Sequence, residues 1–221
     1  MSLVVDHAFI TCDRQAPEAE ALRELGYVEG SGNTHPGQGT ANRRFFFDNF
    51  MLELFWVENP AEATSEQTRR TRLWDRWSGR DTGCSRFGIV FCQDRDEPST
   101  APFPTWSYHP SYLPPGTAIE IAEGTTLEEP ELFYLPFLRR GRPSLEPVDH
   151  APPVRRICGL SVSVPHMDNL SVPSQSARDA GLLSYFESAS PVLEVRFESD
   201  DPQVIDLAPA LPLRFRGVTR E

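Results

Sequence analysis

Residues 3–12 read LVVDHAFITC, and this stretch is the first unit of the pattern that decides the fold. Side chains of a strand alternate between two faces, so His7 and Phe9 share one face. A helix is predicted to follow, because Pro17 suits its first turn and Gly26 suits its end. The chain therefore begins its regular structure with a strand and a helix.

Three more strands are predicted before residue 58. Residues 27–30 form a short one, 40–48 carry three phenylalanines, and 50–57 are apolar on both faces. Residues 31–39 are rich in glycine and have no apolar anchor, which predicts a loop. Residues 1–58 thus read as one strand-helix-strand-strand-strand module.

The remaining chain divides into three parts. A helical linker is predicted at 59–83, a second and irregular module at 84–140, and a strand-rich C-terminal module at 141–221. Proline-rich stretches, at 97–115 and 139–153, read as loops. The predicted strands lie at 87–92, 117–122, 132–138, 157–164, 192–197 and 211–215, with a short helix at 174–180. The pattern predicts an α+β fold with more strand than helix.

Composition limits the classes of function. The 221 residues carry a formal net charge of −11, which disfavours binding to nucleic acid. All 21 basic residues are arginine, which excludes a lysine Schiff base and a phosphate-loop lysine. No stretch reaches the ~20 apolar residues of a membrane helix, and no signal peptide is recognised, so a cytoplasmic protein is expected. The four cysteines lack metal-ligand spacing.

Glu53 is the first candidate for a functional residue. It shares a strand face with Met51 and Phe55, so burial would cost several kcal/mol unless the charge is paired, hydrogen-bonded or bound to a metal. One interpretation is an ion pair with Arg43 or Arg44 of the preceding strand. The other is a functional carboxylate, and the residues alone leave both open.

His7 is the second candidate. A single histidine on an apolar face is more often a hydrogen-bonded core residue than a ligand. However, His7 and Glu53 lie in the first and last strands of one module. An imidazole and a carboxylate that converge on one cavity suit a divalent metal with open positions for a substrate. The pair is therefore a hypothesis for a metal site.

The loop from His35 to Arg43 is a third candidate. Its glycines permit close approach of a ligand, and Asn42 and Arg43 offer donors to a carboxylate or carbonyl. The alternative is a turn in which Thr40 and Asn42 hydrogen-bond the backbone. Neither a dinucleotide fingerprint nor a Ser-His-Asp elbow occurs, so no nucleotide cofactor is expected.

Weaker candidates lie later in the chain. Glu120 shares a strand face with two alanines, which could leave room for a cavity. Glu194 stands beside Arg196, which favours a surface ion pair. His109 lies in a proline-rich loop and has no predicted position relative to His7.

The first 58 residues resemble a known family. The set consists of Asp6-His7, then Leu25-Gly26-Tyr27, then His35-Pro36-Gly37-Gln38-Gly39-Thr40-Ala41-Asn42-Arg43, then Leu52-Glu53-Leu54. In order and spacing it resembles the glyoxalase-like branch of the vicinal oxygen chelate superfamily. The resemblance implies an α+β fold of paired βαβββ modules, with curved mixed sheets around a central cavity, as in glyoxalase, bleomycin resistance and dihydroxybiphenyl dioxygenase proteins.

The resemblance also implies a metal site. In metal-dependent relatives a first-strand histidine and a fourth-strand glutamate bind a divalent ion, and His7 and Glu53 match them. The second module should supply two more ligands. Those positions are Phe87 and Tyr134 if the module begins near 87. They are Leu160 and Glu194 if it begins near 157. Other residues, with His109, Glu120 and Glu194 as candidates, would have to complete the site, or the chain is a metal-free member.

Two functions follow from the resemblance. The first is a bacterial metal-assisted lyase, isomerase or oxygenase of a small oxygen-rich substrate, with Asn42, Arg43 and His35 binding that substrate. The second is a non-catalytic protein that binds an antibiotic or aromatic compound in an apolar cavity. A structural or regulatory protein is a third hypothesis. Either a monomer or a homodimer could close the cavity.

Overall fold

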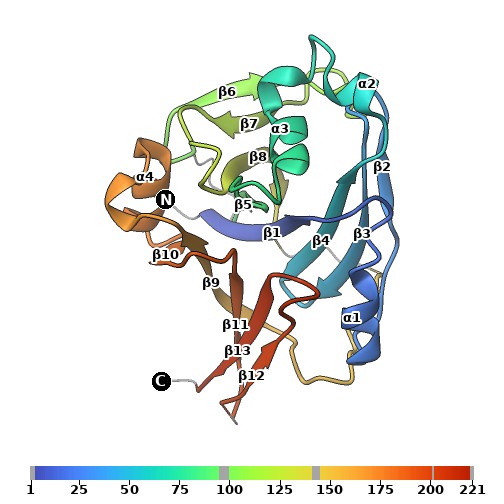
Figure 1. Cartoon of the computed structure of the whole chain (residues 1–221), viewed down its shortest axis with the longest axis vertical. Coiled ribbons are helices and arrows are strands. Elements are labelled where there is room, and N and C mark those ends of the chain that lie inside the picture. The colour runs from blue at the N-terminus through green and yellow to red at the C-terminus, as the bar shows by residue number, and fades with distance from the viewer. Residues whose placement is uncertain (1–2, 95–99, 141–144, 201, 220–221) are drawn as a thin grey trace.

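Two mixed β-sheets, packed against each other, form the molecule (Figure 1). The computed structural model describes residues 3–94, 100–140, 145–200 and 202–219. The larger sheet has eight strands in the order β2-β3-β4-β1-β5-β8-β7-β6 and curls into a half-barrel. Its strands are β1 (Leu3–Thr11), β2 (Asn33–His35), β3 (Thr40–Phe47), β4 (Phe50–Val57), β5 (Phe87–Gln93), β6 (Thr105–Tyr108), β7 (Ile119–Ala122) and β8 (Glu131–Arg139).

The larger sheet consists of two related modules. Strand β1 pairs parallel with β4, and β5 pairs parallel with β8. The modules join where β1 runs antiparallel to β5. Helix α1 (Ala19–Glu24) connects β1 to β2, whereas no helix is found between β5 and β6 among the described residues. The curved α+β fold of paired modules, expected from the resemblance, is confirmed.

The second sheet repeats part of this plan. Its order is β10-β9-β11-β13-β12, with β9 antiparallel to β11 and each of these flanked by a parallel partner. The strand parallel to β9 is β10, so β11 and its Glu194 do not occupy the place of β4 and Glu53. The elements are β9 (Ile157–Val164), β10 (Ser184–Glu187), β11 (Leu193–Glu198), β12 (Val204–Asp206), β13 (Leu213–Val218) and α4 (Val172–Asp179).

The strands that were not predicted are short and lack a continuous apolar pattern. β2 falls inside the expected loop, while the expected strand at 27–30 is reduced to one bridge between Glu29 and Phe45. β6 lies in the proline-rich stretch. β2, β6 and β12 are edge strands, held by pairing with the neighbouring strand more than by burial of their own side chains.

The predicted linker helix is broken into three turns. α2 (Pro60–Ala63) begins at Asn59, whose side chain accepts hydrogen bonds from two backbone amides of the first turn. A 3-10 turn at Arg69–Thr71 ends at Arg72, where φ is 58°, and α3 (Leu73–Ser78) follows. The left-handed residue redirects the chain, so α3 lies across one end of the half-barrel (Figure 1). No helix of the described residues could span a membrane.

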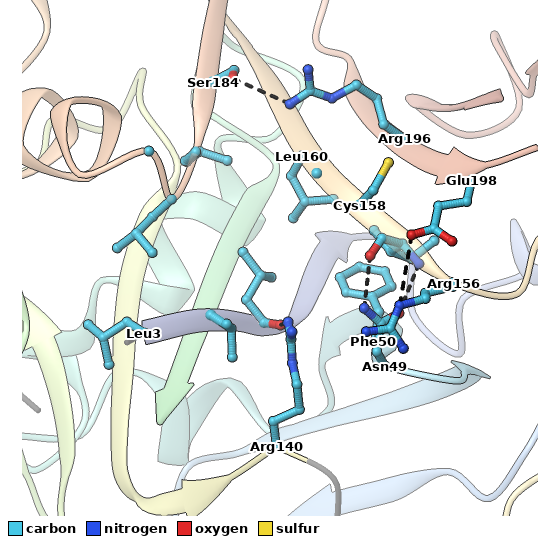
Figure 2. A pocket seen from close by; sticks show the side chains of 17 residues that line it. Leu3, Asn49, Phe50, Arg140, Arg156, Cys158, Leu160, Ser184, Arg196 and Glu198 are labelled. Atoms are coloured by element: carbon cyan, nitrogen blue, oxygen red, sulfur yellow. Dashed lines mark hydrogen bonds and ion pairs between the residues drawn. The ribbon is translucent and has the colours of Figure 1, made fainter. Parts of the chain in front are cut away.

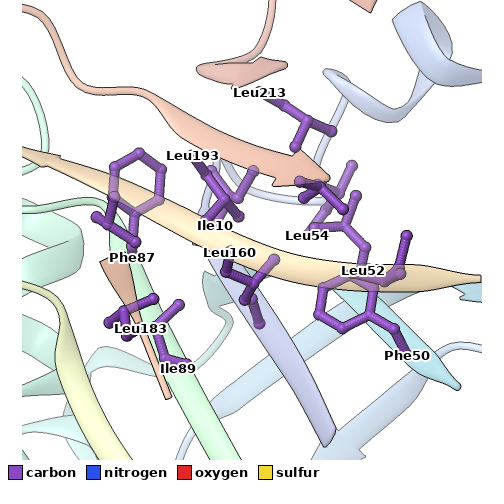
Figure 3. Close-up of a cluster of buried hydrophobic side chains, with 14 of the residues drawn as sticks. Ile10, Phe50, Leu52, Leu54, Phe87, Ile89, Leu160, Leu183, Leu193 and Leu213 are labelled. Atoms are coloured by element: carbon purple, nitrogen blue, oxygen red, sulfur yellow. The ribbon is translucent and has the colours of Figure 1, made fainter. Parts of the chain in front are cut away.

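The main hydrophobic core lies between the two sheets. Ile10, Leu52 and Ile89 point from the back of the larger sheet toward Leu160 and Leu193 of the smaller one (Figure 3). All five are at most 1% exposed. Because this core uses the convex face of the larger sheet, the concave face is left to form a cavity.

A buried ion pair anchors α3. Arg76 is 0% exposed and donates through Nε and Nη2 to Glu131 Oε2, at 3.0 and 2.9 Å. Further guanidinium protons go to the carbonyl oxygens of Thr126 and Glu129, and Thr125 Oγ1 donates to Glu131 Oε1 at 2.6 Å. One arginine thus ties α3 to the start of β8 and to the turn before it.

Removal of one partner is expected to leave the other charge buried and unpaired. Arg76→Met should lower the free energy of unfolding by about 3–5 kcal/mol, measured by urea denaturation. Arg23→Met is the control, since the exposed pair of Arg23 with Glu20 should contribute below about 1 kcal/mol. Equal losses in the two variants would contradict this role of Arg76.

Candidate functional site

A cavity of about 440 Å³ occupies the concave face of the larger sheet. Its walls come from both modules, and Leu73 of α3 adds to the lining. Its size suits a small organic molecule. The lining residues include Asp6, His7, Phe9, Asn33, His35, Gln38, Arg44, Met51, Glu53, Phe55, Val90, Tyr108, Tyr112, Phe133 and Leu135.

Most of the wall is aromatic and aliphatic. The ring of Phe9 stacks on Phe55 with centroids 4.8 Å apart, and its centroid lies 5.7 Å from that of Phe133. Gly88 on β5 permits this packing, because a Cβ there would come within 2.1 Å of the Phe9 ring. The rings from β1, β4 and β8 thus form one apolar surface suited to a flat hydrophobic ligand.

Glu53 interrupts the apolar wall. Glu53 is only 8% exposed, and its carboxylate accepts no hydrogen bond from the residues that the structure describes. Arg44 lies opposite Glu53 in the pairing of β3 with β4. However, the Arg44 guanidinium donates to the carbonyl oxygen and hydroxyl of Ser31 at 2.6 and 2.7 Å. The ion pair considered from the sequence is therefore absent, and the carboxylate remains available to a ligand.

Asp6 and His7 line the cavity together, although consecutive residues of a regular strand point to opposite faces. The pairing of β1 with β5 shifts register between Val5 and His7, and this bulge lets both side chains reach the cavity. Asp6 Oδ2 and His7 Nδ1 are 2.6 Å apart. The contact fixes the imidazole and leaves Nε2 as its second polar atom.

This contact and nearby charge shift the ionisation of His7. Burial alone would lower the pKa of His7, but the hydrogen bond to Asp6 and the charges of Glu53 and Asp6 outweigh it, so the pKa is raised above 6.5. Burial likewise opposes the charge of Asp6, but the contact with His7 wins and the pKa of Asp6 is lowered. The imidazole is therefore biased toward its charged form beside two carboxylates.

His35 lies at the same polar end of the cavity. Its Nδ1 is 2.9 Å from Thr40 Oγ1, and its ring centroid is 4.8 Å from that of Tyr112. Burial lowers the pKa of His35, which favours the neutral ring. The hydroxyl of Tyr112 donates to the side-chain oxygen of Gln38 at 3.3 Å. These groups add neutral donors and acceptors near Glu53.

The other two predicted ligand-binding residues are placed differently. Asn42 lies on the cavity face of β3, but its Oδ1 accepts a hydrogen bond from the Asn33 amide, and it does not line the cavity. Arg43 lies on the opposite face and pairs with Glu29 and Glu20. Arg43 therefore does not line this cavity, because strand alternation gives that face to its neighbour Arg44, and its role in binding a substrate stays a prediction.

The weaker candidates do not reach this cavity. Glu120 accepts hydrogen bonds from Thr105 and Ser107 on the other face of β7. His109 contacts the carbonyl of Thr117. Glu194 lies in the second sheet and accepts a hydrogen bond from Arg216. None of the three lines the cavity that His7 and Glu53 share.

The donor set does not fit the four-ligand metal site that the resemblance implies. Phe87 and Tyr134 belong to the core between the sheets, and the second module presents Val90 and Phe133 to the cavity instead. Within the described residues, no three histidine, cysteine or carboxylate side chains are grouped so as to hold a metal. His7 and Glu53 thus face an apolar wall where two further ligands would stand.

Several cavity residues were not predicted as site residues. Arg44 could have been found by extending the alternation of β3 from Asn42. Asp6 could not, because only the bulge turns it toward the cavity. Tyr112 and Leu73 come from segments without a regular pattern, and only the path of the chain brings them to the site.

One solved structure of low sequence identity agrees with this fold. The chain aligns over its full length with the full length of a hypothetical protein from Staphylococcus aureus, with 9% identity and a TM-score of 0.52. A mutant of 4-hydroxymandelate synthase from Streptomyces coelicolor aligns with 99% of this chain and 62% of its own, with 13% identity and a TM-score of 0.38. No curated protein sequence matches the chain.

A sequence model of the glyoxalase-like domain matches residues 5–171. The match spans both modules of the larger sheet and strand β9 of the second sheet, and so includes the strands that line the cavity. The chain belongs to the glyoxalase-like domain family.

Proposed function

We propose that this protein binds a small hydroxylated aromatic compound in the cavity of the larger sheet. The observation that carries the proposal is the Glu53 carboxylate, which is buried and not hydrogen-bonded by the described residues, at the edge of an aromatic wall. A buried carboxylate without a donor is unfavourable. A ligand hydroxyl that donates to Glu53 would remove this cost.

A hydroxyl group matches the polar end better than other head groups. It donates one hydrogen bond and accepts others, so it can donate to Glu53 and accept from His7 Nε2. A carboxylate ligand would be repelled by Asp6 and Glu53, and a hydrocarbon would leave Glu53 unpaired. The ring of the ligand would pack against Phe9 and Phe133.

The binding experiment compares 2-naphthol with naphthalene, measured by calorimetry and by the shift in melting temperature. The wild-type protein should bind 2-naphthol more tightly, and Glu53→Gln should weaken that binding about tenfold or more while hardly changing the binding of naphthalene. Glu120→Gln is the matched control, because it changes the same functional group on the outer face of the sheet.

Two results would contradict the proposal. One is binding of 2-naphthol that Glu53→Gln and Glu120→Gln weaken equally. The other is that the wild-type protein binds neither compound and that Phe133→Ala, whose cavity is enlarged, also binds neither. A correctly folded variant is verified by circular dichroism before each titration.

A second function, proton transfer next to a carbonyl, is favoured by the raised pKa of His7. Glu53 would take a proton from the carbon beside the carbonyl, and the C–H electrons would move onto the carbonyl oxygen. The His7 imidazolium would stabilise that oxyanion by a hydrogen bond. The protonated histidine stabilises the negative charge that a metal ion would otherwise stabilise, so no step depends on the incomplete metal site.

This second function predicts exchange of the α-protons of 2-hydroxyacetophenone in D₂O, followed by NMR. Glu53→Gln and His7→Gln should each slow the protein-dependent exchange by about 10²-fold or more. Glu120→Gln should retain the wild-type rate. Exchange no faster than in buffer would contradict catalysis and leave the binding proposal as it stands.

The charge state of His7 gives a prediction of its own. Because its folded pKa is raised, the protonated histidine stabilises the fold fully below pH 6.5, and this contribution is lost as pH rises through the folded pKa. Asp6→Asn should lower the His7 pKa, since burial then dominates, and should reverse the sign of this pH dependence. NMR titration of the imidazole protons measures the pKa, with His7→Gln for assignment and the exposed Asp179→Asn as control. An unchanged titration in Asp6→Asn would contradict the effect.

A further inference from the structure

A second cavity of about 370 Å³ opens between the two sheets, where β1 faces β9 and β10 (Figure 2). β1 contributes Leu3 and Val5 to it, and the second sheet contributes the starts of β9 and β10. Part of the lining is apolar, with Phe50 and Leu160 beside the β1 residues. This cavity lies outside the site described above.

Three arginines line this cavity in a protein whose net charge is −11. Arg140 extends from the end of β8 toward β1, Arg156 lies before β9, and Arg196 projects from β11 across β9 (Figure 2). Among the described residues, Glu198 is the one carboxylate that lines the cavity. The cavity therefore carries an excess of positive charge that the rest of the sequence does not have.

The pairing of these arginines is weak. Arg140 is 3.7 Å from Asp94, and Arg156 is 4.0 Å from Glu198. Arg196 has no carboxylate within salt-bridge distance in the described part of the chain. Its Nη2 donates a long hydrogen bond of 3.5 Å to Ser184 Oγ. Guanidinium groups with so few acceptors favour binding of an anion.

The position of Arg196 is built into the sheet. Arg196 pairs with Gly159 across β9 and β11, and its guanidinium lies over that glycine. A Cβ on Gly159 would come within 2.6 Å of Nη2 and 3.0 Å of Nε. The Nε atoms of both Arg196 and Arg140 are buried and have no acceptor among the residues that the structure describes. Two donors are thus buried at the cavity wall without partners, which is costly unless a ligand completes them.

We propose that this cavity binds a small organic anion whose carboxylate or phosphate head pairs with Arg196, while Arg140 adds positive charge on the β1 side of the cavity. A guanidinium presents two parallel N–H donors, which match the paired oxygens of both head groups. The apolar side chains of Leu3, Phe50 and Leu160 would contact a short hydrocarbon body. The ligand class is therefore distinct from the neutral hydroxylated aromatic proposed for the first cavity.

The experiment titrates the full-length protein with hexanoate, hexyl phosphate, inorganic phosphate and hexanol, by calorimetry at low salt. Hexanoate or hexyl phosphate should bind, and hexanol should not. Preference for one of the two anions identifies the head group, and inorganic phosphate alone should bind more weakly than hexyl phosphate because it lacks the hydrocarbon. Added salt should weaken binding.

Two variants test the assigned geometry. Arg196→Gln should weaken binding of the preferred anion about tenfold or more, and Gly159→Ala should do the same by displacing the guanidinium. Arg155→Gln is the control, because Arg155 is exposed, pairs with Asp149 and does not line the cavity. All variants are verified by circular dichroism and thermal unfolding.

The outcomes separate clearly. Weakened binding in Arg196→Gln with unchanged binding in Arg155→Gln supports the site. Equal weakening in both variants would show that binding depends on general surface charge and would overturn it. An absence of binding of either hexyl anion to the wild-type protein would also overturn it. Glu53→Gln should leave anion binding unchanged, so failure here is distinct from failure of the aromatic site.

Discussion

The pairing of β1 with both modules is the constraint on which the rest of the structure depends. On one side β1 runs parallel to β4, and on the other it runs antiparallel to β5. The first pairing brings His7 and Glu53 to one wall, since Phe9 is the partner of Glu53 in that register. The second joins two modules that would otherwise have open edges, and so produces a curved sheet with a cavity on its concave face. The irregular pairing between Val5 and His7 then turns Asp6 toward the same cavity.

Strand alternation was sufficient to predict which strand face His7 and Glu53 occupy. His7 and Glu53 share the cavity because each shares a strand face with aromatic residues that line it, namely Phe9 and Phe55. Arg43 was named as a ligand-binding residue from its place in the glycine loop, whereas alternation from Asn42 leads to Arg44 on the cavity face. Three features needed the three-dimensional path of the chain: the bulge at Asp6, the edge strand β2, and the placement of α3 over the end of the cavity. None of them has a local sequence signal, because pairing and packing with distant segments stabilise them.

The second module explains how a family fold can keep a cavity while changing its chemistry. Its strands retain the topology of the first module, since β5 and β8 repeat the parallel pairing of β1 and β4. Its side chains differ, because Val90 and Phe133 face the cavity in place of polar ligands. Half of a symmetric donor set is thereby replaced with hydrophobic surface. The result is an asymmetric cavity, with polar groups on one wall and rings on the other, which suits an amphipathic ligand better than a fully coordinated cation.

The two cavities differ in their ligand chemistry, and each is lined by a different part of β1. Leu3 and Val5 face the arginine-lined cavity, whereas His7 and Phe9 face the aromatic one, and the bulge lies between the two groups. Arg140 of the arginine-lined cavity donates a hydrogen bond to the carbonyl oxygen of Val5 at 3.4 Å, and its charge helps to lower the pKa of Asp6. The Asp6–His7 pair of one cavity therefore lies within the electrostatic influence of an arginine that lines the other.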